Sequence, residues 1–244
     1  MVEWSKRGVV QVEGDRENWW QVNETNPFAR CDFSLKANDA CLQEWSQSHT
    51  GPYGEGAAPL GLLYKSSVSE TNESDLFLFG AAGVVFRGYF PGYSTYQAPP
   101  TSWFWSVVKM QTGNQAGTVT LRSADPRQAP EINFNFFAEK GERDLQAIQE
   151  AVEHTMQIFN ATGEPYAPYT VIEPPPSVDV RQGIMDEAFS HHATSTCRMG
   201  PAGDKNYCVE SNFKFPRTPG GFPAAPTFVI SQKAFEAILK SIKN

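Results

Sequence analysis

One stretch of the sequence has a clear helical period, and it sets the first limit on the fold. Between Asp144 and Asn160 the apolar residues recur at spacings of three and four, which places them on one side of a helix: Leu145, Ile148, Val152, Met156 and Phe159. Gly163 marks its expected end. A helix with one apolar stripe must pack against another apolar layer.

Four short segments have the composition of β-strands and supply that layer. Residues 75–79 form an apolar run, and residues 103–110 are rich in aromatic and β-branched side chains. Residues 118–122 and 132–136 alternate with period two on either side of a proline-containing loop. We therefore predict an α+β fold, in which an antiparallel sheet of strands near 75–80, 103–110, 118–122 and 131–136 carries the 144–160 helix on one face.

The remaining segments are predicted to be shorter or irregular. Glycine and proline together make up 37 of the 244 residues (19 and 18), which favours many short elements and disfavours a helical bundle. Residues 1–70 are expected to be polar and irregular apart from a short helix at 42–45, and residues 165–176 to form a loop. Two more helices are expected, at 180–189 and at 227–242.

Charge and hydropathy exclude some classes of function. The net charge is −7 and no basic patch stands out, which argues against nucleic-acid binding. No window approaches the roughly 18 uninterrupted apolar residues of a membrane span, so no membrane association is expected. Apolar residues make up 40% of the chain, which is enough for a packed core.

Cysteines and glycosylation motifs bear on the compartment. The four cysteines are too few for a disulfide scaffold of this length, although one or two bridges remain compatible with the sequence. Three triplets, beginning at Asn23, Asn72 and Asn160, match the N-glycosylation acceptor pattern. Residues 1–7 do not resemble a signal peptide, because no apolar region follows them. The compartment stays open, with the triplets favouring secretion.

The residues most suited to chemistry are His191 and His192. They follow a predicted helix and precede a run of small residues up to Gly200, where the backbone can approach a flat ligand closely. A histidine there can accept a proton near neutral pH, or it can simply be solvated in a surface loop. His49 and His154 are assigned no role. A metal site made of His191, His192, Cys197 and Cys208 is a weaker alternative, because no Cys-x-x-Cys spacing is present.

Three motifs resemble the glucose–methanol–choline (GMC) oxidoreductases. The run from His192 to Gly200, with Thr196, Cys197 and Met199, resembles the family's catalytic histidine segment. Residues 117–133 are similar to the strand–loop–strand of its substrate domain, and residues 226–234 to the start of its C-terminal helix. The resemblance covers residues 40–244, and it implies a substrate domain with a six-stranded sheet backed by helices.

The resemblance also implies flavin chemistry on a small-molecule alcohol. Members of the family hold FAD and oxidise an alcohol to a carbonyl, with a histidine as the base and flavin N5 as the hydride acceptor. By motif position His192 corresponds to that base, and His191 to the neighbouring residue that lies against the flavin ring. Phe222, Pro223 and Ala224 correspond to residues along the flavin edge.

The sequence departs from the family in three places. No Gly-x-Gly-x-x-Gly fingerprint is present, so the chain is interpreted as the C-terminal half of a longer protein whose flavin-binding half is missing. Residues 212–215 run directly into 216–219, where the family has an additional strand and turn. Phe222 replaces the family's second active-site residue, a histidine or asparagine, and its ring cannot form that residue's hydrogen bonds.

These departures leave alternatives open. The chain is expected to divide into a substrate-binding domain, residues 1–180, and a part with the catalytic histidine segment and a flavin-domain remnant, residues 181–244. It is either part of an FAD-dependent oxidoreductase acting on CH–OH groups, or a non-catalytic fragment or binding module unable to hold FAD. A third alternative is a GMC-like enzyme with a non-redox reaction, which Phe222 keeps open. For these 244 residues alone, weak or no retention of FAD is expected.

Overall fold

The computed structural model describes residues 18–21, 30–31, 35–55, 60–82, 102–114, 116–163, 169–173, 175–189, 199–201, 209–210, 228–229, 231–236 and 239. The chain groups into two compact units. The first unit comprises residues 1–13, 109–144 and 190–244, and the second unit comprises residues 14–108 and 145–189. The predicted division at residue 180 is a functional one that this grouping does not test.

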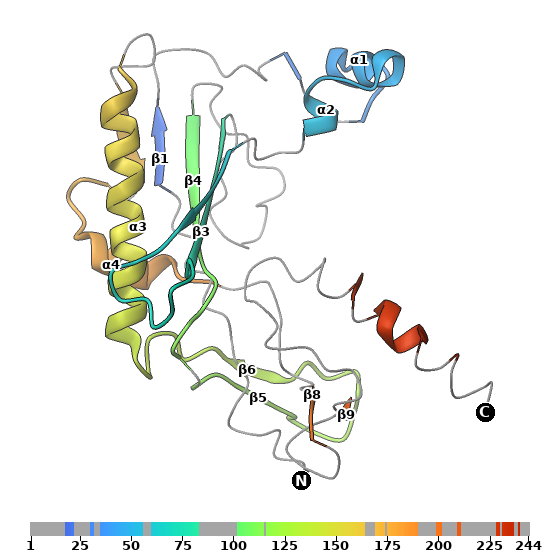
Figure 1. Ribbon diagram of the computed structural model, residues 1–244, viewed down its shortest axis with the longest axis vertical. Coiled ribbons are helices and arrows are strands. Elements are labelled where there is room, and N and C mark those ends of the chain that lie inside the picture. The colour runs from blue at the N-terminus through green and yellow to red at the C-terminus, as the bar shows by residue number, and fades with distance from the viewer. Residues whose placement is uncertain are drawn as a thin grey trace. The chain divides into compact units, whose positions relative to one another are not determined.

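The second unit is built on a five-stranded sheet with the strand order β2-β3-β4-β1-β7. The pairs β2–β3, β1–β4 and β1–β7 are antiparallel, and Figure 1 shows several of the strands beside the long helix α3. The bounds of the strands are Asn18–Gln21 (β1), Leu60–Tyr64 (β2), Leu76–Ala82 (β3), Ser102–Lys109 (β4) and Thr170–Glu173 (β7).

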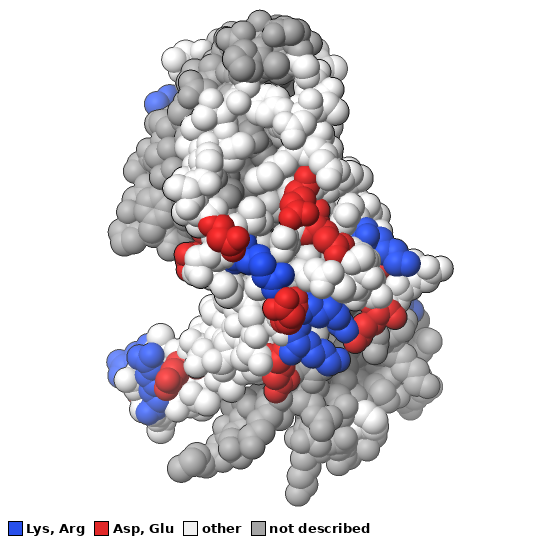
Figure 2. Space-filling view, turned by 90° about the vertical axis from the view of Figure 1, so that its left-hand side faces the viewer, with Lys and Arg blue, Asp and Glu red and all other residues white. Residues whose placement is uncertain are grey.

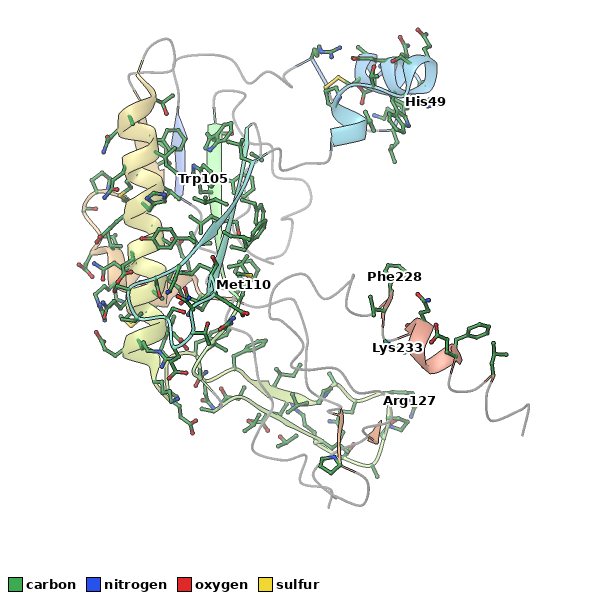
Figure 3. All side chains as sticks on the ribbon, in the orientation of Figure 1. His49, Trp105, Met110, Arg127, Phe228 and Lys233 are labelled. Carbon is green, nitrogen blue, oxygen red and sulfur yellow. A yellow bond between two sulfur atoms is a disulfide. The ribbon has the colours of Figure 1, made fainter. Side chains whose placement is uncertain are left out.

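Helix α3, Gly141–Thr162, packs against one face of this sheet. The Phe159 ring meets Trp103 of β4 with centroids 6.2 Å apart, and His154 meets Tyr64 of β2 at 5.0 Å. The predicted stripe is buried at Leu145, Ile148, Val152 and Phe159, and Figure 3 draws the side chains of α3 and of the neighbouring strands as sticks. The predicted helix and its apolar side are thus confirmed.

The opposite face of the sheet has its own apolar cluster. Alternation along β4 turns Phe104 away from Trp103 and Trp105. Phe104 and Ala81 are buried together, with Phe79 and Ile172 packed against them. The Phe79 and Phe104 rings meet edge to face, with centroids 6.0 Å apart. The aromatic residues of β4 therefore belong to the core on both faces of the sheet.

In the first unit, β5 (Thr118–Thr120) and β6 (Glu131–Asn133) form an antiparallel pair of their own. The prediction that these strands join the same sheet as β3 and β4 was wrong. Each has only three residues, and Ile132 is more than half exposed, so neither presents a buried face to a larger sheet. A second short pair, β8 (Met199–Gly200) and β9 (Val209–Glu210), is parallel.

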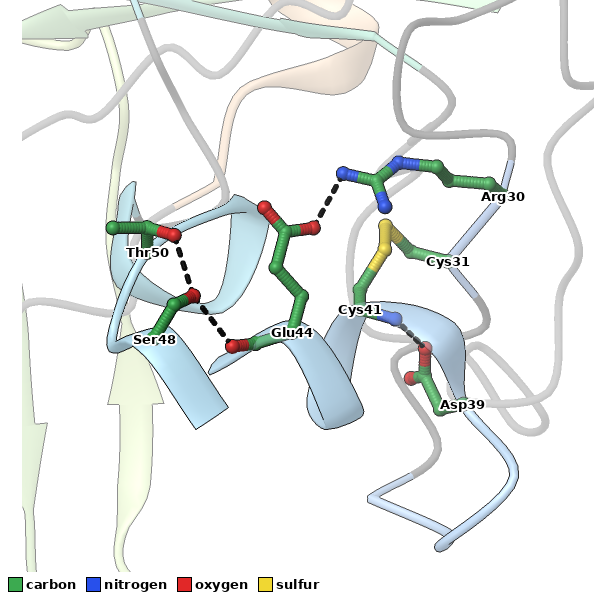
Figure 4. A network of polar contacts seen from close by, with 7 residues as sticks. All are labelled: Arg30, Cys31, Asp39, Cys41, Glu44, Ser48 and Thr50. Carbon is green, nitrogen blue, oxygen red and sulfur yellow. Dashed lines mark hydrogen bonds and ion pairs between the residues drawn. A yellow bond between two sulfur atoms is a disulfide. The ribbon is translucent and has the colours of Figure 1, made fainter. Parts of the chain in front are cut away.

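The N-terminal part of the second unit is more ordered than the sequence suggested. Helix α1, Ala40–Ser48, contains the predicted short helix, and α2, Pro52–Glu55, follows it. Asp39 caps α1 by accepting a hydrogen bond from the Cys41 amide at 2.9 Å. Cys31 and Cys41 form a disulfide, and Arg30 pairs with Glu44 at 2.6 Å (Figure 4). One of the bridges that the sequence allowed is therefore present.

Three strands of the five-stranded sheet were missed for physical reasons, and the two-residue strands β8 and β9 were not predicted either. β1 has four residues, β2 is interrupted by Gly61 and lacks a period of two, and β7 lies in a proline-rich stretch. Each is recognisable only through its pairing with a neighbour. Helix α4, Val180–Glu187, confirms the predicted 180–189 helix. In the predicted C-terminal helix, residues 228–229, 231–236 and 239 are helical.

Candidate functional site

The predicted site residues His191, His192, Phe222, Pro223 and Ala224 lie outside the described residues, and so do Cys197 and Cys208. The next described residue is Met199, the first residue of β8. Met199 is level with Val209 and Gly200 with Glu210 in the parallel pair. The last two residues of the predicted histidine segment, Met199 and Gly200, are therefore in a strand, and the roles assigned to His191 and His192 stay a prediction.

The best-defined polar site of the first unit is centred on Asp144, in the first turn of α3. Its carboxylate accepts hydrogen bonds from the Gly113 amide at 3.0 and 2.9 Å, from the Asn114 amide at 3.2 Å, and from the Thr112 hydroxyl. The Asp144 side chain is fully buried, as is Asn114. Burying a carboxylate is tolerable only when donors surround it, and four hydrogen bonds do so here.

Asn114 extends this site to the segment after β6. Its amide nitrogen donates to the Asn135 carbonyl at 2.9 Å, and its amide oxygen accepts from the Glu139 amide at 3.1 Å. Asn135 in turn donates to the Ala116 carbonyl at 2.8 Å. We call these five residues, Thr112, Gly113, Asn114, Asn135 and Asp144, the Asp144 cluster. It fixes the two ends of the β5–β6 hairpin to each other.

The backbone around this cluster is strained. Asn135, Phe137 and Lys140 have φ values of 45°, 61° and 50°, in the left-handed region that non-glycine residues seldom adopt. A Cβ on Gly141 would lie 2.6 Å from the Phe137 Cβ, so only glycine fits at the start of α3. Such strain persists where surrounding contacts over-determine the backbone, which the Asp144 cluster does. The cluster is thus a positioning device, because its carboxylate oxygens already bind the donors around them.

Two carboxylates organise the β2–β3 loop, residues 65–75, in the second unit. Asp75 accepts hydrogen bonds from the Ser66 amide at 2.8 Å and the Ser66 hydroxyl at 2.7 Å. Glu150 of α3 accepts from the Ser67 amide at 2.7 Å and from the Ser67 hydroxyl. Sheet, loop and helix are joined at this point.

These contacts shift two pKa values. Burial acts to raise the pKa of Glu150, but the hydrogen bonds from Ser67 and Gln146 outweigh it and leave the pKa below its usual value. Burial raises the pKa of Tyr64, and the charges of Glu150, Asp75 and Glu153 raise it further. Both groups therefore keep their ordinary forms near neutral pH, which suits a structural role.

Two further features, a metal site and a membrane-spanning helix, are absent from the described residues. Within them, no cluster of three or more His, Cys, Asp or Glu side chains is arranged to bind a metal ion. None of the helices in that part of the chain has the length and apolarity that crossing a bilayer demands. Acidic and basic side chains are interspersed among the residues coloured in Figure 2.

Residues 113–222 match the family model described as GMC oxidoreductase. The match starts at Gly113 in the Asp144 cluster, includes His191 and His192, and ends at Phe222. Over this stretch, which is a little less than half of the chain, the sequence is similar to the GMC oxidoreductases, and one of the curated relatives carries the same family description.

Individual relatives place this similarity within longer proteins. The chain is 27% identical over 208 residues to an oxygen-dependent choline dehydrogenase of Brucella anthropi, which covers 73% of this chain and 37% of that protein. It is also 27% identical over 243 residues to a glucose methanol choline oxidoreductase of Aspergillus terreus. That alignment covers 88% of this chain and 39% of that protein. The chain thus spans well under half the length of these relatives.

The fold is shared with solved GMC oxidases. A formate oxidase structure superimposes with a TM-score of 0.71 at 18% identity, covering 98% of this chain and 48% of that one. A pyridoxine 4-oxidase superimposes with a TM-score of 0.55 at 13% identity, covering 96% and 44%. The predicted α+β class, an antiparallel sheet backed by helices, is confirmed.

Proposed function

We propose that this chain carries the substrate domain and the catalytic histidine segment of an FAD-dependent oxidoreductase that converts an alcohol to a carbonyl compound. The observation that carries the proposal is the family match over residues 113–222, because it contains the whole His191–Gly200 motif. The choline dehydrogenase relatives support a CH–OH donor as the substrate class.

His192 is proposed as the base. An alcohol hydroxyl is a very weak acid, and its alkoxide releases hydride far more readily than the alcohol does. A neutral imidazole that removes the hydroxyl proton therefore lowers the barrier, and histidine is the side chain type that takes up a proton near neutral pH. His191 is proposed to lie against the cofactor ring, where it would exclude water and orient the substrate.

FAD, when bound, supplies the hydride acceptor. The residues of this chain fit the flavin ring better than the rest of the cofactor. Residues 193–196 and Gly200 are small and permit a close approach to a planar ring, and the β8–β9 pair anchors their C-terminal end. In contrast, the sequence has no Gly-x-Gly-x-x-Gly loop for the pyrophosphate. We propose that the remaining length of the relatives corresponds to the part that binds it.

A second candidate function rests on Phe222. In the proposed site its ring would occupy the position of a hydrogen-bonding side chain, and it can neither donate nor accept such a bond. This favours a member of the family that uses the flavin environment for a non-redox step. Pro223 and Ala224 remain compatible with either function, since both would contact the flavin edge through apolar atoms.

Reduction of the bound flavin by substrate under anaerobic conditions separates these functions. The protein that contains these 244 residues would be loaded with FAD and mixed with a panel of primary alcohols, including choline. Alcohol oxidation predicts bleaching of the flavin absorbance together with one carbonyl product per reduced flavin. Bound flavin that stays oxidised with every alcohol, while another substrate is converted, would favour the non-redox alternative. A protein that retains no flavin under any condition would contradict both.

A further inference from the structure

We infer that Asn72 carries an N-linked glycan, attached in an oxidising secretory compartment where the Cys31–Cys41 disulfide also forms. Two independent observations on the second unit lead to this inference: the geometry of one acceptor triplet, and the disulfide. Neither depends on the proposed oxidoreductase activity.

Asn72-Glu73-Ser74 lies in the outer part of the β2–β3 loop. Both ends of that loop are anchored, since Ser66 binds Asp75 and Ser67 binds Glu150. Between these anchors the chain follows a series of bends. The Ser69 hydroxyl stabilises them by donating hydrogen bonds to the carbonyl oxygens of Thr71 and Glu73. An ordered surface turn of this kind presents its tip to solvent without help from the rest of the fold.

The functional groups of the triplet are accessible. Asn72 is exposed, and its side-chain oxygen accepts a hydrogen bond from Lys65 at 3.0 Å. Among the described residues its amide nitrogen donates no hydrogen bond, and the Ser74 hydroxyl forms none either. The nitrogen that would bear the sugar and the hydroxyl that the acceptor motif requires are therefore both available.

The Asn160 triplet is presented differently. It lies in the last turn of α3, where the Thr162 hydroxyl donates to the Ile158 carbonyl at 2.9 Å. The Asn160 side-chain oxygen accepts a hydrogen bond from the Tyr169 hydroxyl at 2.5 Å. The Asn160 triplet is therefore a poorer glycosylation acceptor than the Asn72 triplet, because its backbone is helical and its threonine hydroxyl is already hydrogen-bonded within the helix. The Asn23 triplet lies outside the described residues.

The disulfide independently indicates the compartment. Disulfides form and persist in secretory and extracellular environments and are rare in the cytosol. Cys41 is fully buried in α1, and its amide binds the capping residue Asp39, so this bridge is part of the folded structure. The same compartment holds the lipid-linked oligosaccharide donor that N-glycosylation needs.

The modification is a group transfer. The Asn72 amide nitrogen forms a bond to the anomeric carbon of a lipid-linked oligosaccharide pyrophosphate. The bond from that carbon to the pyrophosphate oxygen breaks, the lipid pyrophosphate leaves, and the amide nitrogen loses one proton. The product is a bulky, hydrophilic group on the exposed turn between β2 and β3.

Peptide mapping of the natural full-length protein tests the inference. Enzymatic removal of N-glycans in heavy-oxygen water should convert Asn72 to labelled aspartate and leave Asn160 unlabelled, and non-reducing digestion should release Cys31 and Cys41 as one linked pair of peptides. Expression in a secreting eukaryotic cell adds matched variants. N72Q and S74A should lose the glycan-dependent gel shift, while S74T and N160Q keep it. Unlabelled Asn72, or free Cys31 and Cys41 thiols, in the natural protein would overturn the inference.

Discussion

Asp144 binds the backbone amide of Gly113 with both of its carboxylate oxygens, at 3.0 and 2.9 Å. The two residues are separated by the whole β5–β6 hairpin, so this contact closes the hairpin at its base. The family match also starts at Gly113 and ends at Phe222, so this contact lies at the beginning of the matched segment.

Replacing Asp144 should therefore destabilise the first unit. In D144A the Gly113 amide and the Thr112 hydroxyl lose the carboxylate that accepts from them, and the Asn114 amide keeps only its hydrogen bond to the Thr112 oxygen; an unsatisfied buried donor costs about 1–3 kcal/mol. We expect the free energy of unfolding in urea to fall by at least about 2 kcal/mol. E153Q, an exposed change on the same helix, should stay within about 0.5 kcal/mol. Equal unfolding midpoints for D144A and E153Q would show that the cluster contributes nothing.

Reduction of the Cys31–Cys41 bridge should loosen the segment around α1. Closing a loop of this length, with ten residues of separation, constrains the unfolded chain by about 2–3 kcal/mol in the chain-entropy account. We expect a reducing agent, or the double variant C31S/C41S, to speed proteolysis within residues 30–55 specifically. Cleavage in the β5–β6 hairpin should keep its rate. If both regions are cleaved faster to the same extent, the disulfide does not stabilise the segment around α1 specifically.

Glu150 should make stability depend on pH in the acidic range. Its folded pKa lies below the unfolded value, so its contribution is fully present above about pH 4.5 and is lost as pH falls through the lower, folded value. In S67A one of the stabilising hydrogen bonds is gone, and the pKa of Glu150 should rise. Carbon-detected NMR titration of the Glu150 carboxyl measures this directly. An unchanged or lower pKa in S67A would mean that Ser67 is not the cause.

His192 should be the histidine whose loss affects turnover most. In the proposed oxidoreductase, H192A should lower the rate of alcohol oxidation by roughly 10²–10⁴, the usual contribution of a general base. H154A is the matched control, because His154 packs on Tyr64 in the second unit and should affect stability rather than turnover. An H192A protein with bound flavin and an unchanged rate would remove His192 from the reaction.

The 244 residues alone should retain little or no FAD. The flavin ring is only part of the cofactor, and the sequence lacks the glycine-rich loop on which a pyrophosphate is usually held. We expect the purified chain to be colourless after gel filtration with added FAD. Release of one flavin per chain on denaturation would contradict this expectation.

The sequence predicted the elements whose signal is local. The stripe from Leu145 to Phe159 is sufficient to define α3, because helical periodicity needs no partner. The strands β1, β2 and β7 were missed because each is short and gains its identity from hydrogen bonds to a neighbour. The placement of β5 and β6 in the main sheet was wrong for the same reason, since alternation reveals a strand and not the strand that it pairs with.

For the candidate site, the sequence identified motifs but not supporting contacts. His191 and His192 were found from their neighbours Thr196 to Gly200 and stay a prediction. The Asp144 cluster was missed because Asp144 in a first helical turn is expected on general grounds, and nothing in the sequence distinguishes a buried, fourfold-bonded carboxylate from a solvated one. The only local hint was Asn135, a residue type that tolerates the left-handed backbone found there.

The interleaving of the two compact units along the polypeptide has a practical consequence for experiments. The first unit is assembled from residues 1–13, 109–144 and 190–244, with the second unit inserted twice between these pieces. Shortening the gene from either end would thus damage both units before it isolated one. To express the five-stranded sheet of the second unit without the histidine segment, residues 14–108 would have to be joined directly to residues 145–189.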